Sequence, residues 1–343
     1  MLSLRILQDD TNRLTIRYLQ THIIPNAHRA DIYSTAVTPS QVLSASGSSS
    51  IHIYSTRGQI TYAEGADNEH QHPLTQTLEG VHPLGCLQIC TSLDGRLAAS
   101  AGFNGELRIW KRSEYGHWSS AGREVPEEKK AGEHWALALS ENRQYLACTI
   151  NDGRTNIYDT RTIFAGGAAH KFAQFKTQGS LDTSVDIFAD DSMTSSGRQN
   201  GSIYIFNKST ARLAHSLAGL SKPVRSVRFS PTCKSLATAG DARTIALHDT
   251  HSGEQLAILM GHGSWIMSLD WNWNGEYLLG GGYDGEAKIW SLEGREYVET
   301  QTESGKSLWS VRWLPKVASS NDEVFVTAGT GGTLAFYREA GKT

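Results

Sequence analysis

The residues best suited to bind another molecule are aromatic and acidic side chains that recur at two matching positions of the chain. Three segments align closely, Ser226–Phe229, Ser268–Trp271 and Ser310–Trp313, and four others follow the same pattern. The position just before the pattern holds Tyr33, Leu87, Trp135, Thr183, Arg225, Met267 and Trp309. Two residues further upstream lie Asp31, Gly85, Glu133, Leu181, Pro223, Trp265 and Ser307.

These two columns combine aromatic rings and Met, which are enriched at binding hot spots, with carboxylates that pair with a guanidinium group. They favour recognition of another protein by stacking and by ion pairing. The predicted partner-binding residues are Asp31, Tyr33, Glu133, Trp135, Arg225, Trp265, Met267 and Trp309. The alternative, in which the aromatic side chains only fill an opening in the fold, stays open.

Catalytic motifs are absent from the sequence. There is no GxSxG, no HExxH and no GxxxxGK[ST] phosphate loop. His70 and His72 have no further metal ligand at an obvious spacing, and the four cysteines include no C-x-x-C pair. Asp190 and Asp191 lie where a turn is expected, which is a common place for Asp without any acid–base role. We expect no enzyme activity, no metal and no cofactor.

The composition excludes several other classes of protein. The chain has 343 residues, 39% of them hydrophobic, and a formal net charge of −3, so it lacks the Lys/Arg excess of a nucleic-acid binder. No stretch of about 18 apolar residues is present. Arg5 and the acidic pair that follows do not fit a secretory signal. We therefore expect a soluble intracellular protein.

The elements that position these residues belong to an internal repeat. Seven short segments read as strands with a bulky residue near their end, and these residues are Tyr54, Trp110, Tyr158, Phe206, His248, Trp290 and Tyr337. A strand of small residues precedes each of them, as in LAASAG (97–102). Units of about 40–45 residues with several short strands match blades of a β-propeller. The sequence predicts an all-β fold, a single seven-bladed propeller over 1–343.

The first residues are expected to close the ring. Residues 14–24, within an N-terminal segment 1–26, read as one more strand, which would form the outer strand of the last blade and protect an open edge. Two segments exceed the repeat and are interpreted as insertions at about 63–79 and 112–132. A solvated surface loop is the simple interpretation of each, and a contact loop is the alternative.

The repeats resemble WD repeats. Gly261-His262 followed by Trp290 is the clearest signature, His28 and His82 occupy the same position as His262, and Asp284 lies in the turn before the third strand. In this family such a His, Asp and Trp form a hydrogen-bonded set that stiffens the blade, so the resemblance implies a structural role for the three histidines.

Five stretches narrow the resemblance to the WD-repeat subunits of fungal superkiller complexes. They are AHRADIYS (27–34), KPVRSVRFSP (222–231), HGSWIMSLDW (262–271), GYDGEAKIW (282–290) and FYREAG (336–341). The resemblance implies a non-catalytic scaffold, monomeric by itself, that binds a tetratricopeptide-repeat subunit and an RNA helicase in exosome-dependent cytoplasmic mRNA decay. It also implies a role in meiotic recombination through the double-strand-break protein, and hence a nuclear pool. Partners would present an Arg and a downstream apolar residue to the predicted binding residues.

A second function remains open at Tyr158-Asp159-Thr160-Arg161, which is close to the W-D-x-R sequence by which some WD-repeat proteins dock on the adaptor of a cullin ubiquitin ligase. There the Arg on the underside of the blade makes the contact. Here Tyr replaces Trp, so the match is partial. Co-purification of a cullin would favour this substrate-receptor function over the scaffold.

Overall fold

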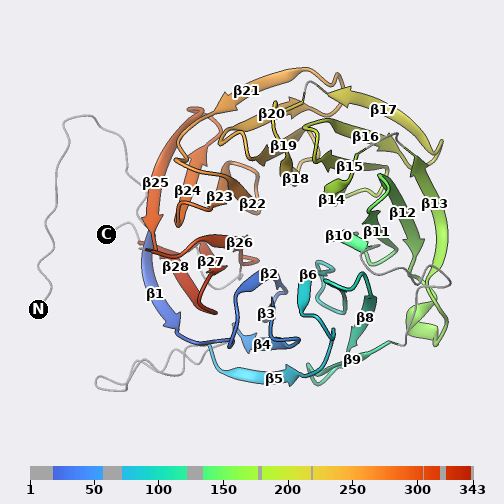
Figure 1. The fold of residues 1–343 in the computed structure, drawn as a ribbon, viewed down its shortest axis with the longest axis vertical. Helices are drawn as coiled ribbons and strands as arrows, with labels where there is room; N and C mark the ends of the chain where they lie inside the picture. Colours follow the sequence, from blue (N-terminus) through green and yellow to red (C-terminus); the bar gives the residue numbers. More distant parts are fainter. Residues whose placement is uncertain are drawn as a thin grey trace, which may run out of the picture.

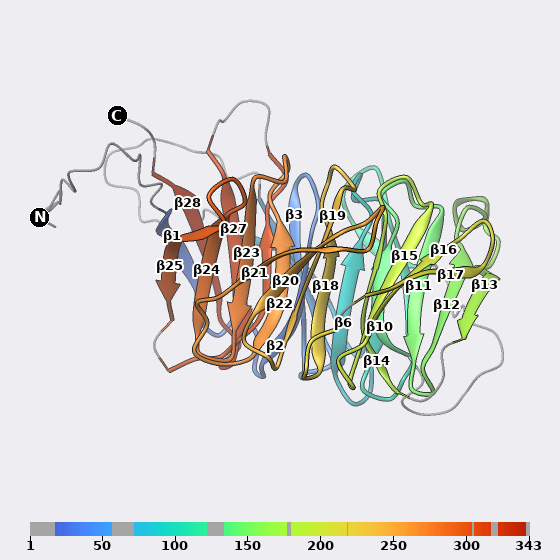
Figure 2. The same ribbon diagram turned by 90° about the horizontal axis from the view of Figure 1, so that it is seen from above.

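Seven four-stranded antiparallel sheets, the blades of a propeller, surround a central channel (Figure 1). The computed structural model describes residues 18–56, 72–121, 134–176, 180–217, 219–303, 305–316 and 322–340. Seen from the side, the blades form a disc with the strands running between its two faces (Figure 2). This confirms the predicted seven-bladed all-β fold. The described residues contain no helix long and apolar enough to cross a membrane.

Each blade places its strands in order from the channel to the rim, and the blades are numbered 1 to 7 in the order in which their innermost strands are given next. The innermost strands are β2 (Ile32–Val37), β6 (Cys86–Thr91), β10 (His134–Leu139), β14 (Asp182–Ile187), β18 (Val224–Phe229), β22 (Ile266–Trp271) and β26 (Leu308–Trp313). The second strands are β3 (Gln41–Ser46), β7 (Leu97–Gly102), β11 (Tyr145–Ile150), β15 (Met193–Arg198), β19 (Ser235–Gly240), β23 (Tyr277–Gly282) and β27 (Val324–Gly329).

The third strands are β4 (Ile51–Ser55), β8 (Leu107–Arg112), β12 (Arg154–Asp159), β16 (Ile203–Asn207), β20 (Ile245–Asp249), β24 (Glu286–Ser291) and β28 (Leu334–Glu339). The outer strands are β5 (Leu74–Leu78), β9 (Trp118–Ser120), β13 (His170–Lys176), β17 (Arg212–Leu217), β21 (Gln255–Leu259), β25 (Glu296–Thr302) and β1 (Tyr18–Ile24). A short 3-10 helix, η2 (Ile163–Ala165), follows β12.

The sequence pattern of the repeats explains how the blades pack. The bulky residue near the end of each third strand is buried in all seven blades. The second strands carry small residues because the neighbouring blade lies close: a Cβ on Gly281 of β23 would stand 2.5 Å from Val311 Cγ1 of β26. Larger side chains there would clash, so these positions fix the spacing between blades.

Side chains of the innermost strands also bond the backbone of the next blade. Gln88 Oε1 accepts from Leu137 N at 2.8 Å, and Asp270 Oδ2 accepts from Trp313 N at 2.8 Å. The last blade bonds the first in the same way, since Thr35 N donates to Ser310 Oγ at 3.0 Å. These bonds tie the ring together around the channel.

The N-terminal strand closes the last blade, as predicted. β1 pairs antiparallel with β28, and the order of this sheet is β1-β28-β27-β26. Tyr18 is buried against the rings of Trp313 and Phe325, with centroid distances of 5.6 and 5.4 Å. The described strand starts at Tyr18, and residues 14–17 of the predicted segment lie outside the described residues.

Deletion of residues 1–26 is expected to lower the melting temperature or to cause aggregation, because β28 would lose its partner and become an open edge. Thermal unfolding, monitored by circular dichroism, measures the change in melting temperature. Deletion of residues 1–16, which keeps β1, is the matched control. A melting temperature that is the same for both truncations and the full chain would contradict closure by this strand.

The two predicted insertions are partly strand. Leu74–Leu78 forms β5 and Trp118–Ser120 forms β9, so a loop interpretation is wrong for these residues, while residues 57–71 and 122–133 lie outside the described part of the chain. The outer strand of a blade faces solvent and needs few apolar residues. Its polar sequence therefore resembles that of a loop.

The WD-type histidines are structural. His262 Nδ1 lies 3.0 Å from Asp284 Oδ2, and Gly263 N donates to the same oxygen at 2.8 Å. Trp290 packs on the His262 ring but donates its indole N–H to Met260 O at 3.2 Å, so it does not join the His–Asp bond as the resemblance implied. In blade 2, His82 and Trp110 instead share the hydroxyl of one serine, Ser100.

Asp284 is expected to make stability depend on pH. Burial opposes its ionisation, but bonds from His262 and from backbone N–H groups outweigh this and lower its pKa to about 2. Its contribution is therefore full above about pH 4 and is lost as the pH falls towards 2.

Asp284→Asn is expected to reduce the free energy of unfolding at pH 7 by about 1–3 kcal/mol. The difference from the wild type should shrink between pH 4 and 2. Urea unfolding at several pH values measures it, with Asp152→Asn in an exposed turn as the control. A difference that stays constant down to pH 2 would contradict the assigned pKa.

Candidate partner-binding face

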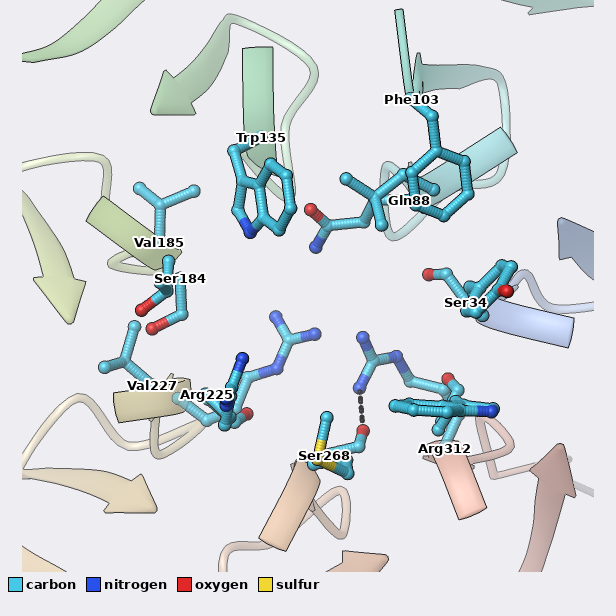
Figure 3. A pocket seen from close by; sticks show the side chains of 18 residues that line it. Ser34, Gln88, Phe103, Trp135, Ser184, Val185, Arg225, Val227, Ser268 and Arg312 are labelled. Carbon is cyan, nitrogen blue, oxygen red and sulfur yellow. Dashed lines mark hydrogen bonds between the residues drawn. The ribbon is translucent and has the colours of Figure 1, made fainter. Parts of the chain in front are cut away.

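All seven residues of the first predicted column line one chamber at the mouth of the channel. The structure brings together Tyr33, Leu87, Trp135, Thr183, Arg225, Met267 and Trp309, one from each innermost strand or the residue beside it. The chamber has a volume of about 280 Å³, and side chains from all around the ring point into it (Figure 3). The blades' inner strands begin on this side, which we call the mouth side.

The second column lies at the outer edge of this mouth. Trp265 is 42% exposed, and Asp31 is half-buried with its Oδ1 accepting from Gly331 N at 3.0 Å. Within the described residues no bond reaches Oδ2 of Asp31. Glu133, the other predicted carboxylate, lies outside the described residues.

Five aromatic side chains form a continuous arc along the mouth, which we call the aromatic arc: Phe103, Tyr33, Trp309, Tyr283 and Trp265. Successive ring centroids lie 5.1, 5.7, 5.9 and 5.6 Å apart in that order. These separations are those of interacting aromatic pairs. Because the rings hold one another in place, the arc offers a rigid surface for stacking or for an apolar side chain.

Two members of the arc, Phe103 and Tyr283, were not predicted from the sequence. They are 38% and 47% exposed and lie in the turns that join the second and third strands of their blades. An alignment of the residue that follows LAASAG and LLGGG would have found them, because that position lies next to the mouth in every blade. The prediction considered the innermost strands alone.

A polar group lies beside one end of the arc. Arg225 bonds Asp241 through two nitrogens, at 2.8 and 3.0 Å, and its guanidinium lies 5.6 Å from the centre of the Trp265 ring. The indole N–H of Trp309 is buried and has no hydrogen-bond partner within the described residues, so Trp309 offers its ring and not its N–H to a ligand.

Trp135 stands apart from the arc. It points into the chamber beside Gln88, across from Arg312 (Figure 3), and its ring packs against the core between blades 3 and 4.

Burial, and then the nearby Asp31 charge, raise the pKa of Tyr33, so its hydroxyl stays protonated at neutral pH. The mouth thus combines two apolar areas with hydrogen-bond donors, among them the Tyr33 hydroxyl and the Arg225 guanidinium.

Arg161, of the sequence related to cullin-adaptor docking, lies on the opposite side of the disc. β12 runs parallel to β10, so it ends away from the mouth. The Arg161 side chain is 57% exposed and its Nε lies 3.0 Å from both oxygens of Asp159. It is available to a partner on the underside but already holds a carboxylate.

Seven four-stranded blades with a His–Asp pair define a WD-repeat β-propeller. The family model for the WD domain, G-beta repeat, matches residues 211–249 and 253–291, which span β17–β20 and β21–β24. Each match therefore covers the outer strand of one blade and the three inner strands of the next. The second match contains Gly261-His262 and Trp290, the clearest WD signature in the sequence.

Comparison with curated proteins narrows the family. The chain is 32% identical over 323 residues to the meiotic recombination protein rec14 of Schizosaccharomyces pombe, covering 94% of this chain and 98% of rec14. It is 26% identical over 337 residues to the antiviral protein SKI8 of Saccharomyces cerevisiae, covering 82% of each. Human striatin matches 49% of this chain at 27% identity. The chain belongs to the WD-repeat family of rec14 and SKI8, which confirms the resemblance inferred from the five stretches.

Proposed function

We propose that this protein is a non-catalytic scaffold that docks segments of its partners on the aromatic arc. The observation that carries the proposal is the arc itself, a continuous row of five rings, three of them exposed and two half-buried, at one face of a rigid ring of blades. Exposed aromatic residues held in place at little entropic cost are typical of binding hot spots.

The relatives support a choice of partners. The name of SKI8 and the sequence resemblance favour a superkiller complex, in which the chain would bind a tetratricopeptide-repeat subunit and an RNA helicase in cytoplasmic mRNA decay. The name of rec14 favours a second role in meiotic recombination, through the double-strand-break protein, in the nucleus. One docking surface could serve both, since partners that carry the same short segment would bind in turn.

The charges of the mouth decide where an arginine of the partner would lie. No carboxylate lines the chamber within the described residues, whereas Asp31 lies at its edge. The guanidinium would therefore bind at the edge, next to Asp31 and Tyr33, and a downstream apolar residue would pack on the rings further along the arc.

Affinity purification of the tagged chain from native extract, followed by mass spectrometry, tests the choice of partners. Recovery of the tetratricopeptide-repeat subunit and the helicase supports the scaffold, and recovery of the double-strand-break protein from meiotic cells supports the second role. Recovery of a cullin with its adaptor, abolished by Arg161→Ala, would instead support a ligase receptor that uses the underside.

The isolated chain is expected to show no saturable binding to single-stranded RNA at physiological salt, because its net charge of −3 provides no basic field. Fluorescence anisotropy with a labelled oligonucleotide measures this. Tight binding that weakens steeply with salt would show that the chain contacts RNA directly, and would overturn this part of the proposal.

A further inference from the structure

The chamber beneath the mouth has a one-sided charge. Among its lining residues are three arginines, Arg225, Arg228 and Arg312, and no Asp or Glu. The carboxylates that act on these arginines do not line it: Asp241 lies beside Arg225, Asp186 lies beside Arg228, and Asp270 acts on Arg228 and Arg312. Within the described part of the chain, the charged residues that line the chamber are therefore all cationic.

The opposite end of the channel differs. A second cavity of about 190 Å³ lies there, and Glu141, Asp186 and Asp270 line it together with the far sides of Arg228 and Arg312. The arginines thus separate an acidic lower cavity from an upper chamber without acids. A ligand inside the upper chamber meets arginines and no carboxylate among the described lining residues.

Arg312 is the least compensated of the three arginines. Its Nη1 donates to three neutral oxygens, those of Ser268 Oγ, Leu269 O and Val311 O, at 3.1 to 3.4 Å. Arg225 and Arg228 each have a carboxylate within 3.2 Å, but no ion pair joins Arg312 to any carboxylate of the described residues. Burial and the neighbouring Arg228 lower the pKa of Arg312 to about 10 against the opposing effect of Asp270 and Asp186, so it remains charged at neutral pH.

Figure 3 shows the Arg312 guanidinium reaching into the open centre of the chamber, with its bond to Ser268 drawn. A half-buried cation without a direct ion pair is poorly compensated, and an anion placed beside it recovers part of the lost solvation. Guanidinium groups match the geometry of carboxylate and phosphate oxygens.

We propose that the upper chamber is a binding site for an oxyanion, a carboxylate or a phosphate, held by Arg312 with Arg225 and Arg228 beside it. The proposal does not rest on the docking function, since a small anion can enter the chamber without a partner protein. If a partner segment carries both charges, its cation would bind at the edge near Asp31 and its anion would bind inside the chamber.

Inorganic phosphate is the probe. Isothermal titration of the full chain with phosphate at low salt is expected to show saturable binding to one site. Arg312→Met, which keeps the packing of the stem, should weaken it by about tenfold or more, the effect of losing a charge-assisted hydrogen bond. Arg161→Met on the underside is the matched control and should bind phosphate like the wild type. Melting curves establish that each variant is folded, and Arg225→Met replaces Arg312→Met if the latter does not fold.

Absence of saturable phosphate binding by the wild type, or equal affinity in the folded chamber variant, would overturn the proposal. Competition with acetyl-Phe-Glu-amide and acetyl-Phe-Gln-amide distinguishes the two possible sources of the anion, a side chain of a docked segment and a free small oxyanion. Displacement of phosphate by the Glu peptide alone indicates the side chain of a docked segment, whereas displacement by neither indicates a free small oxyanion. Both outcomes support the site, and neither depends on whether the partners of the scaffold have been found.

Discussion

Trp309→Ala is expected to weaken the binding of an Arg-containing partner segment by about 2 kcal/mol or more, which is roughly a thirtyfold loss of affinity. Trp309 lies in the middle of the aromatic arc, in contact with Tyr33 on one side and Tyr283 on the other. Its removal breaks the arc into two parts. Trp135→Ala is expected to have an effect of the same size from the far wall of the chamber.

Calorimetry with the partner segment measures these losses, and a melting curve for each variant excludes unfolding. Asp31→Ala should weaken the same interaction by less, because a carboxylate at a wet edge gains little from its ion pair. Arg161→Ala, on the underside, should leave it unchanged. Wild-type affinity in folded Trp135 and Trp309 variants would show that partners use another face.

Single substitutions at Asp182 or Arg198 are expected to have the largest effect on stability. Both side chains are fully buried, with Arg198 Nε 2.6 Å from Asp182 Oδ1. Thr155 Oγ1 donates to Asp182 at 2.9 Å, and Arg198 Nη2 donates to Gly153 O at 3.0 Å, so the pair joins blades 3 and 4. Removal of one partner leaves the other charge buried without this ion pair.

Asp182→Ala or Arg198→Met should each reduce the free energy of unfolding by about 3–5 kcal/mol. The corresponding positions of the fifth blade, Val224 and Gly240, carry no charge. The double variant Asp182→Val, Arg198→Gly should therefore regain most of the loss. Urea unfolding measures all three proteins. A loss below about 1 kcal/mol in both single variants would mean that the pair does not bear on stability.

The fold could be predicted from the sequence because a propeller repeats one local pattern seven times. Small residues in the second strand and a bulky residue in the third, such as Trp110 or Trp290, are required by the contact between blades. The same residue types therefore recur at these positions in every unit. The pairing of β1 with β28 followed from the same reasoning, since a ring of strands cannot leave an edge open.

The candidate site was predictable only in part. Residues on the innermost strands, such as Tyr33 and Trp309, share a register, and so their meeting at the mouth could be read from an alignment. Phe103 and Tyr283 come from turns, whose residues follow no packing rule. The position of the charges was not predictable either, because whether Asp186 faces the upper or the lower cavity depends on its bond to the next blade.

Polar segments were also misread for a physical reason. β5 and β9 lie at the rim, where one edge and one side of the strand face solvent, so their sequences carry no alternation of apolar residues. The buried pair of Asp182 and Arg198 broke the apolar pattern of the fourth blade in the same way. A charged residue that is paired in the interior cannot be distinguished, from the sequence alone, from a charged residue exposed to solvent.

Hydrogen–deuterium exchange of the full chain in complex with the tetratricopeptide-repeat subunit tests the docking face most directly. The account predicts new protection in the mouth-side turns, at residues 103–106 and 283–285 and in the segment 26–31 that carries Asp31. The underside, from Asp159 through η2, should exchange as in the free chain. Protection confined to that underside, with the mouth-side turns unchanged, would contradict the claim that partners dock on the aromatic arc.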